Sequence, residues 1–319
     1  MFKIKKSLNS IKNKLRLNFY NHPQTYKVNY RVEVFNNSDF KKEFFLVLPI
    51  PSNTKYQSIL DSVSFFPQID GKGEDLKYGN KYVFWKMNLK VQESFVVQEN
   101  FSIKVKPRSK ILEKGLKLQD YEDETKNQIY KEKNSFLNLE NDDIQDLADE
   151  IVRDEDRIDE ILQKINNYLI ANFKYGDPIP GLYSAKDGLS RKCIDCGGFS
   201  SLFVSLCILR GIPARILSGF WAGYKNNTMH AWPEILLPNE KWMPVDPAVE
   251  YLYRHEKTLK FGSLDNLDNI GSDRIVFSQG CDIPIILDNK EFRVPILQTP
   301  FIYPKEGLEI KVDFLTEKS

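Results

Sequence analysis

The run from Cys196 to Arg210 is the feature that most limits the folds open to this chain. It reads CGGFSSLFVSLCILR, and almost every residue in it is apolar or small. A helix that is apolar on all sides belongs in the interior of a domain. The Gly211-Ile212-Pro213 sequence that follows is typical of a helix end. The run therefore predicts a buried helix that begins at Cys196 and ends near Gly211.

Cys196 stands at the N-terminus of this predicted helix. The partial positive charge of a helix N-terminus stabilises a thiolate and lowers a cysteine pKa from its usual value of about 8.5. Gly197 and Gly198 follow directly and remove side-chain bulk where a substrate carbonyl must approach the sulfur. We expect Cys196 to be a nucleophile with a lowered pKa and Gly197 to line the substrate cleft.

A thiol nucleophile needs a base, which is usually histidine. The chain has three histidines, and two of them, His22 and His255, lie in polar segments. His230 lies in the strand-like run MHAWPEILLP, where a histidine can also be a purely structural residue. Asp246 follows in KWMPVDPAVEY, one predicted hairpin later, where a carboxylate can orient an imidazole as the third member of a triad.

Residues 24–108 carry the pattern of an antiparallel sheet. In TYKVNYRVEVFNNSD, apolar residues alternate with polar ones from Tyr26 to Val34, and turn residues follow. Further strand-like runs read KKEFFLVLPIP, KYVFWKMNL and SFVVQENFSIKVKP. Downstream, RIDEILQKINNYLIANF places its apolar residues on one face and predicts an amphipathic helix. Strands followed by helices predict a sandwich-like domain before an α+β domain.

A chain of 319 residues corresponds to about two domains at roughly 150 residues each. The patterns predict a basic N-terminal segment at 1–22 and a sandwich-like β domain at 23–110. A charged linker with a helical part occupies 111–140, and the catalytic domain occupies 141–319.

Composition excludes several classes of protein. A net charge of +1 argues against a globally basic nucleic-acid binder, and the chain has no apolar run long enough for a transmembrane helix. Four cysteines do not make a disulfide scaffold, so we expect a cytoplasmic protein. Residues 1–19 are basic with apolar residues at helical spacing, which fits either weak contact with a membrane surface or a docked terminal helix. The oligomeric state has no signature in the sequence.

Cys193 and Cys196 form a CxxC motif that has several interpretations. A redox pair normally lies in a βαβ context, which the sequence does not predict here. A zinc site with Cys281 or His230 normally needs a second close pair of ligands. A disulfide that caps the nucleophile under oxidation is a third interpretation. We treat Cys193 as incidental and expect no metal and no cofactor.

Together these residues resemble the core of the transglutaminase-like superfamily, and in particular its prokaryotic members of the cysteine protease or amidase type. The resemblance rests on Cys196 with the later GIPAR sequence, on His-Ala-Trp at 230–232, on Trp242 and on Val-Asp-Pro at 245–247. It extends over about residues 130–305. Two positions depart from the family pattern. Ile194 stands where many members have glycine, and Cys281 stands where members often carry arginine.

The resemblance implies an α+β fold of the papain-like type, with the nucleophile helix packed on an antiparallel sheet and a β-sandwich-like domain before it. It also implies thiol acyl transfer. Cys196 attacks an amide carbonyl, His230 transfers the proton and Asp246 holds the imidazole tautomer, while the Cys196 N–H is one oxyanion donor.

We therefore expect a protease, amidase or deamidase that acts on a protein or peptide substrate. The alternatives are transglutaminase-type cross-linking to amines, a non-catalytic binding module and a zinc protein on the same fold. Trp232 lies two residues after the histidine, and Tyr175 lies upstream of the nucleophile. Both are candidates for the cleft wall, and both also fit core positions.

Overall fold

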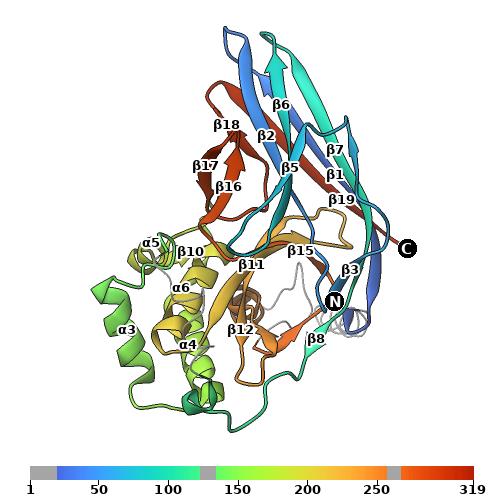
Figure 1. Ribbon diagram of the computed structural model, residues 1–319. Coiled ribbons are helices and arrows are strands. Elements are labelled where there is room, and N and C mark those ends of the chain that lie inside the picture. The colour runs from blue at the N-terminus through green and yellow to red at the C-terminus, as the bar shows by residue number, and fades with distance from the viewer. Residues whose placement is uncertain (1–19, 123–133, 257–266) are drawn as a thin grey trace, which may run out of the picture. The chain divides into compact units, whose positions relative to one another are not determined.

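A computed structural model of the chain describes residues 20–122, 134–256 and 267–319 (Figure 1). The predicted membrane-surface segment at 1–19 lies outside the described residues. The chain divides into two compact units. We call one the helical unit, which contains the described residues of Met1–Pro23, Lys106–Leu217 and Ala231–Asp273. We call the other the β unit, which contains Gln24–Val105, Ser218–His230 and Arg274–Ser319.

The β unit is built on antiparallel sheets. One has the order β19-β1-β7-β3 with β4 also paired to β7, another has the order β18-β2-β6-β5, and β16 pairs with β17. The strands are β1 (Gln24–Asn36), β2 (Lys42–Ile50), β3 (Gln57–Ile59), β4 (Ser64–Phe66), β5 (Gly71–Glu74), β6 (Lys81–Leu89), β7 (Ser94–Val105), β15 (Arg274–Gln279), β16 (Ile283–Leu287), β17 (Lys290–Val294), β18 (Phe301–Tyr303) and β19 (Leu308–Lys318).

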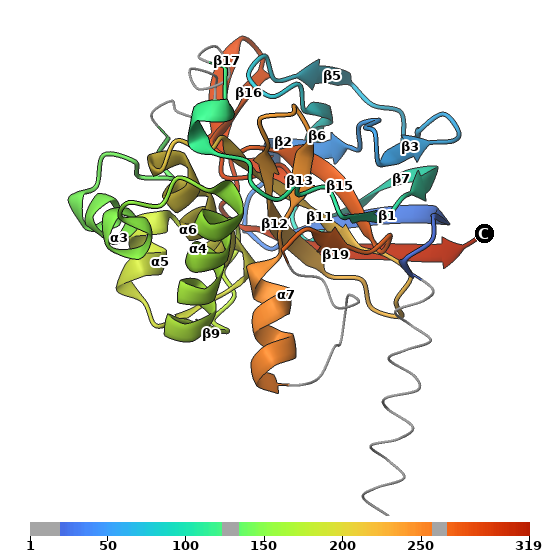
Figure 2. The same ribbon diagram turned by 90° about the horizontal axis from the view of Figure 1, so that it is seen from below.

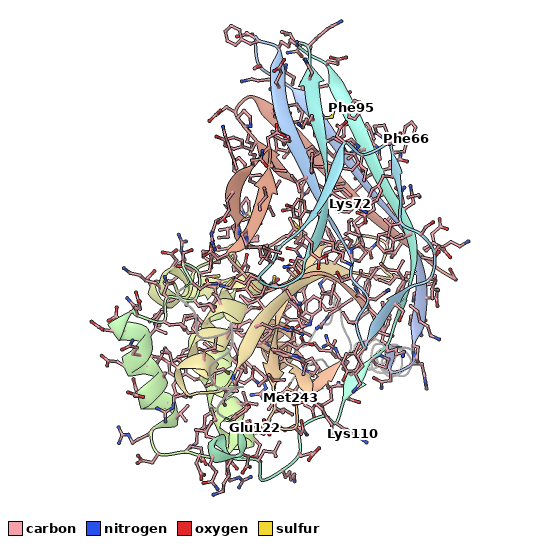
Figure 3. All side chains as sticks on the ribbon, viewed as in Figure 1. Phe66, Lys72, Phe95, Lys110, Glu122 and Met243 are labelled. Carbon is pink, nitrogen blue, oxygen red and sulfur yellow. The ribbon has the colours of Figure 1, made fainter. Side chains whose placement is uncertain are left out.

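The predicted alternation along β1 is confirmed. The five apolar residues from Tyr26 to Val34 are all buried, because successive side chains of a strand point to opposite faces. Inside the unit, four rings pack with centroids 4.1 to 5.9 Å apart: Tyr30, Phe220, Phe277 and Phe314. By contrast, Phe66 on β4 is 69% exposed (Figure 3).

The C-terminal strand belongs to the β unit. β19 pairs with β1 from Tyr26↔Lys318 to Asn36↔Leu308, and β7 pairs with the opposite edge of β1. The chain therefore forms the strands up to Val105 in the β unit, then the helical unit, which Ser218–His230 interrupts, and it returns to the β unit at Arg274. The compact units do not follow the expected division into 23–110 and 141–319, since residues from Arg274 onward lie with the N-terminal strands.

The helical unit contains the predicted nucleophile helix. Its elements are α3 (Asp142–Val152), α4 (Ile158–Asn172), α5 (Ala185–Ser190), α6 (Cys196–Leu209), α7 (Pro247–Tyr251), the short turns Leu118–Asp120 and Leu252–Glu256, and the strands β8 (Arg108–Ser109), β9 (Lys174–Tyr175), β10 (Cys193–Ile194), β13 (Trp242–Pro244) and β14 (Asn269–Ile270). α6 packs against α3, α4, α5 and α7 (Figure 2).

α6 ends as the sequence predicts. Gly211 has a φ of +79°, a conformation that glycine adopts without strain. Its N–H donates to the Ile208 carbonyl at 2.9 Å, and the Ile212 N–H donates to the Cys207 carbonyl at 2.9 Å. This is the Schellman arrangement that satisfies the last carbonyls of a helix. The apolar face predicted for α4 is also buried, including Ile158, Ile161 and Ile165.

Strands β11 (Ala214–Trp221) and β12 (Met229–Leu236) lie in a sheet of order β13-β12-β11-β15. The division between the units falls within both strands. Helices and antiparallel strands together give the α+β fold class that we predicted. Within residues 20–122, 134–256 and 267–319, every helix is too short or too polar to span a bilayer.

Candidate active site

Cys196 is the first residue of α6 and is half-buried. β10 leads into it and pairs in parallel with β9. Asp195 is the N-cap of the helix, with Oδ1 accepting the Gly198 N–H at 3.0 Å and Oδ2 accepting the Ile179 N–H at 3.2 Å. An aspartate at this position satisfies backbone donors that a helix start otherwise leaves without partners. The local sequence thus fixes the start of α6 directly at the thiol.

The Cys196 sulfur has polar partners from three parts of the helical unit. The backbone N–H groups of Ala231 and Gly197 donate to it. The Tyr175 side chain is also hydrogen bonded to Cys196. Ala231 directly follows His230 in β12, so the thiol is bonded to the residue next to the predicted base.

The thiol pKa shifts in the direction opposite to our expectation. Burial, then the carboxylates of Asp195 and Asp246, raise the pKa of the Cys196 thiol to about 12, although the N–H groups of Ala231 and Gly197 act the other way. The expected lowering by the helix N-terminus is therefore outweighed. At neutral pH the sulfur carries its proton, and any nucleophilic attack requires a base that removes it.

Asp246 is fully buried at the N-cap of α7. Its Oδ1 accepts the Val249 N–H at 2.9 Å, which fixes the side chain at the start of this helix. Its charge acts on both Cys196 and Tyr175. Two of the three predicted triad residues, Cys196 and Asp246, are therefore brought together inside the helical unit.

His230 is the second residue of β12 and belongs to the β unit. It is 3% exposed, and its ring stacks on the Trp221 indole with centroids 4.5 Å apart and planes 27° from parallel. The Arg274 guanidinium lies 4.3 Å from the Trp221 ring centroid. The His230 carbonyl accepts a hydrogen bond from the Gln298 side chain at 2.9 Å. His230 is thus held through both its ring and its main chain.

The three predicted cleft residues have different surroundings. Tyr175 is half-buried, bonds to Cys196 and stacks on Phe199 with ring centroids 6.4 Å apart. Burial and the neighbouring Cys196 raise the pKa of the Tyr175 hydroxyl, which stays protonated and can donate a hydrogen bond. Trp232 is fully buried and belongs to the core rather than to an exposed wall.

Packing at the start of α6 requires glycine at position 198 and leaves little room for a side chain at position 197. A Cβ on Gly197 would lie 3.0 Å from Leu182 Cδ1, and one on Gly198 would lie 2.7 Å from Ile194 Cβ. The glycines therefore let the first turn of α6 approach the segments before it. Ile194 fills this contact.

Cys193 lies in a separate environment from Cys196. Its side chain is hydrogen bonded to Asp177, and burial together with that carboxylate raises the pKa of its thiol. A Cβ on Gly176 would lie 2.6 Å from the Cys193 sulfur. All four cysteines are free thiols. Within the described part of the chain, no group of three or more metal-binding side chains is arranged to hold a metal ion.

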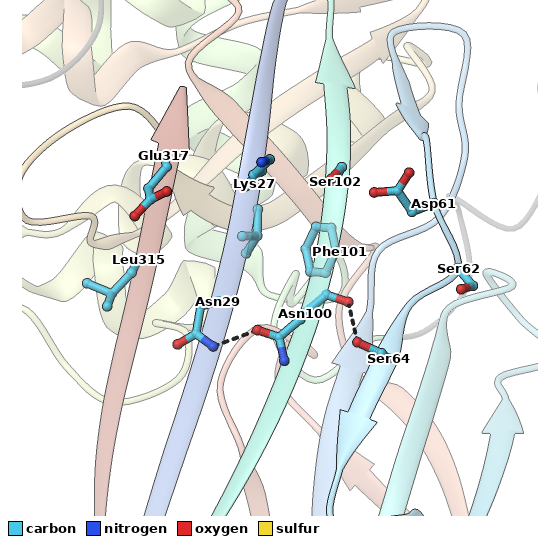
Figure 4. A pocket seen from close by; sticks show the side chains of 11 residues that line it. Lys27, Asn29, Asp61, Ser62, Ser64, Asn100, Phe101, Ser102, Leu315 and Glu317 are labelled. Carbon is cyan, nitrogen blue, oxygen red and sulfur yellow. Dashed lines mark hydrogen bonds between the residues drawn. The ribbon is translucent and has the colours of Figure 1, made fainter. Parts of the chain in front are cut away.

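A pocket of about 560 Å³ lies on the β unit (Figure 4). It is lined by β1, β7, β19 and the segment before β4, and the Asn29 amide donates to Asn100 Oδ1 at 2.6 Å on its floor. None of Cys196, His230 and Asp246 is among the residues that line it.

Sequence reasoning missed two residues of this site. Asp195 has a signal that we did not use, since an aspartate before a predicted helix is typical of an N-cap. Gln298 has no comparable signal, because it lies 68 positions from His230 and only the folded chain brings them together.

Comparisons with known proteins follow this geometry. A search of the curated proteins finds no matching sequence. The crystal structure of a candidate cysteine protease from Cytophaga hutchinsonii is similar over 93% of this chain and 92% of that chain, with a TM-score of 0.60 and 13% identity. The periplasmic domain of TgpA from Pseudomonas aeruginosa matches 76% of this chain and 92% of its own, at 13% identity and a TM-score of 0.34.

The first of these structures shares the fold of the chain, and the TM-score of the second is too low to support an argument. The family model described as Transglutaminase-like superfamily matches residues 145–247. This range includes α6, β12 and the start of α7, and hence the predicted triad. Over residues 145–247, the chain therefore resembles the core of the transglutaminase-like superfamily.

Proposed function

We propose that this protein is a thiol acyl-transfer enzyme that hydrolyses peptide or glutamine-type amide bonds. In this proposal Cys196 is the nucleophile, His230 the base and Asp246 the residue that orients the imidazole. One observation carries it: the Cys196 sulfur bonds to the N–H of Ala231, the residue next to His230, while the Asp246 charge acts on the same sulfur. A thiol nucleophile, an imidazole base and a carboxylate that orients the base together make up a catalytic triad.

The raised thiol pKa defines the first chemical step. As the sulfur forms a bond to the amide carbonyl carbon, its proton passes to the His230 imidazole, and the carbonyl oxygen becomes an oxyanion. The Cys196 N–H at the start of α6 is the proposed first donor to this oxyanion. When the intermediate collapses, the C–N bond breaks and the amine leaves with the proton from the imidazolium.

Water then completes the reaction. The imidazole takes a proton from water, the oxygen attacks the thioester, and the carboxylic acid leaves as the thiol recovers its proton. Hydrolysis is favoured over amine transfer because the C. hutchinsonii structure is that of a candidate cysteine protease. The family resemblance to prokaryotic members supports the same choice.

The experiment compares the two cysteines of the CxxC motif. Wild-type protein, Cys196→Ala and Cys193→Ala are assayed on a peptide library and on glutamine peptides, with ammonia release and amine incorporation measured in parallel. We expect Cys196→Ala to abolish turnover and Cys193→Ala to retain it, because only the Cys196 sulfur attacks the carbonyl. Asp246→Asn should lower kcat by up to about 10⁴-fold, since the imidazole loses its orientation.

Other outcomes separate the alternatives. Equal loss of activity in both cysteine variants would show that the nucleophile is wrongly assigned. Amine incorporation that exceeds hydrolysis would identify a cross-linking enzyme. Wild-type protein that turns over no peptide and no glutamine amide would favour a binding module.

A further inference from the structure

A buried glutamine of the β unit is bonded to the strands that lead to and carry His230. Gln298 is 5% exposed, and it lies in the segment between β17 and β18. Its Nε2 donates to the His230 carbonyl at 2.9 Å and also to the Gly219 carbonyl. One side-chain amide therefore joins β11 to β12 at the level of the proposed base.

The anchor at Gly219 is a position that cannot shift easily. A Cβ on this residue would lie 1.8 Å from the Ile275 carbonyl oxygen, so β11 and β15 approach each other as closely as backbones allow. Gln298 is itself held from the opposite side, because the Tyr30 hydroxyl donates to its main-chain carbonyl at 3.3 Å. Tyr30 in turn packs among Phe220, Phe277 and Phe314. Gln298 thus connects the main chain of His230 to the aromatic cluster in the interior of the β unit.

This contact complements the stack on Trp221. The indole fixes the plane of the imidazole ring, whereas Gln298 fixes the main chain from which the ring projects. Ala231, one residue later, donates its N–H to the Cys196 sulfur. A displacement of His230 along β12 would therefore move the proposed base, which directly precedes the residue that bonds to Cys196.

We propose that Gln298 is a positioning residue for His230, an inference that rests on the proposed function. Gln298 lies outside residues 145–247, so part of the machinery that orients the base comes from the β unit rather than from the family core. Proton transfer depends steeply on geometry, and a misplacement of about 1 Å can cost about 100-fold in rate. Loss of the Gln298 donor therefore lowers kcat and leaves KM nearly unchanged.

The chain offers a matched control in Gln57. Gln57 is 3% exposed in the same unit, and its Nε2 also donates to two main-chain carbonyls, those of Ser52 at 2.9 Å and Val276 at 2.7 Å. Gln298→Met and Gln57→Met each remove one buried amide of the same kind. Tyr30→Phe is a milder variant, because it removes only the hydroxyl bond to Gln298 and keeps the ring in the aromatic cluster.

The first readout is kcat and KM with a peptide substrate of the wild-type protein. The second is the NMR signal of the His230 imidazole in uniformly labelled protein, with His22 and His255 as internal references. We expect Gln298→Met to lower kcat about tenfold to 100-fold and to shift only the His230 signal. Tyr30→Phe should have a smaller effect of the same kind, and Gln57→Met should move neither readout.

The outcomes distinguish this inference from the proposed function. An unchanged His230 signal and unchanged kcat in Gln298→Met would overturn the positioning role. So would equal losses in Gln57→Met, because they would show a general effect of removing a buried amide. If Gln298→Met does not fold, kcat and the His230 signal of Tyr30→Phe test the positioning role in its place. A His230 signal that shifts only in the Gln298 and Tyr30 variants, in a protein without any turnover, would support the positioning role and overturn the proposed function.

Discussion

Each of the two units contains a buried glutamate, and the pKa values of the two glutamates shift in opposite directions. In the helical unit, Glu234 is 3% exposed and lies between two guanidinium groups. Its Oε1 accepts from Arg108, and its Oε2 accepts from Arg215 Nε at 2.9 Å and Nη2 at 2.7 Å. Burial alone would raise the pKa of Glu234, but the charges of Arg215 and Arg108 outweigh it and lower the pKa.

In the β unit, Glu99 is fully buried on β7, opposite Tyr30 of β1 and Phe65 of β4. Among the described residues, neither of its carboxyl oxygens has a hydrogen-bond partner. Burial raises the pKa of Glu99 well above its ordinary value. Burial therefore does not decide the charge of a carboxyl group by itself. Its partners decide whether the buried group is an anion that holds elements together or a neutral acid that the fold tolerates.

The largest effect on stability should come from the paired glutamate. Glu234→Gln leaves the buried guanidinium of Arg108 and the half-buried guanidinium of Arg215 without a counter-charge, and breaking a buried pair in this way costs about 3–5 kcal/mol. Because the folded pKa of Glu234 is lowered, its contribution is present above the unfolded pKa of about 4.3 and is lost as the pH falls through the folded pKa. Urea unfolding at several pH values measures both effects.

The control for this prediction is Glu113→Gln, which removes an exposed partner of Lys241 and should change stability far less. A Glu234→Gln protein as stable as the wild type would show that the two guanidinium groups do not depend on the carboxylate.

The unpaired glutamate should give a smaller effect of opposite sign. Glu99→Met replaces a buried acid without hydrogen-bond partners by an apolar side chain of similar length, and it should raise the free energy of unfolding by about 1–3 kcal/mol at neutral pH. The folded pKa of Glu99 is raised, so the wild type loses stability as the pH rises from the unfolded pKa of about 4.3 through the folded pKa. The advantage of Glu99→Met should therefore grow from pH 4 upward. A difference that does not depend on pH would contradict the assigned protonation.

The smallest expected effect is on the reactivity of Cys196, a half-buried residue whose thiol has carboxylates as neighbours rather than guanidinium groups. With a pKa of about 12, its alkylation by iodoacetamide should rise about tenfold per pH unit from pH 7 to 10 without a plateau. Asp195→Asn removes one carboxylate and keeps a good N-cap, so it should accelerate labelling of Cys196 several-fold at a fixed pH.

Asp177→Asn is the matched control for this labelling experiment, because it removes the carboxylate beside Cys193. It should accelerate labelling of Cys193 alone. A plateau below pH 8 in the wild type would contradict the raised pKa of Cys196.

The sequence predicts the elements of the site better than its electrostatics. α6 and the alternation of β1 follow from local patterns, since the burial of a helix or strand is recorded in the spacing of its own residues. The thiol pKa depends on which groups surround the sulfur in space. The helix N-terminus is visible in the sequence, but the approach of Asp246 and the depth of burial are not. The pairing of β19 with β1 is hidden for the same reason, because its partners lie at opposite ends of the chain.

That pairing sets an order of events during synthesis. β1 leaves the ribosome early, yet one of its edges has no partner until β19 has been made, after the whole helical unit. An unpaired strand edge is a template for association with other chains. The unpaired edge of β1 must therefore be kept from associating with other chains through most of translation. A premature stop before Leu308 would leave this edge without β19 permanently. Such a truncated product would retain Cys196 and all of residues 145–247 and still be prone to aggregate through its β unit.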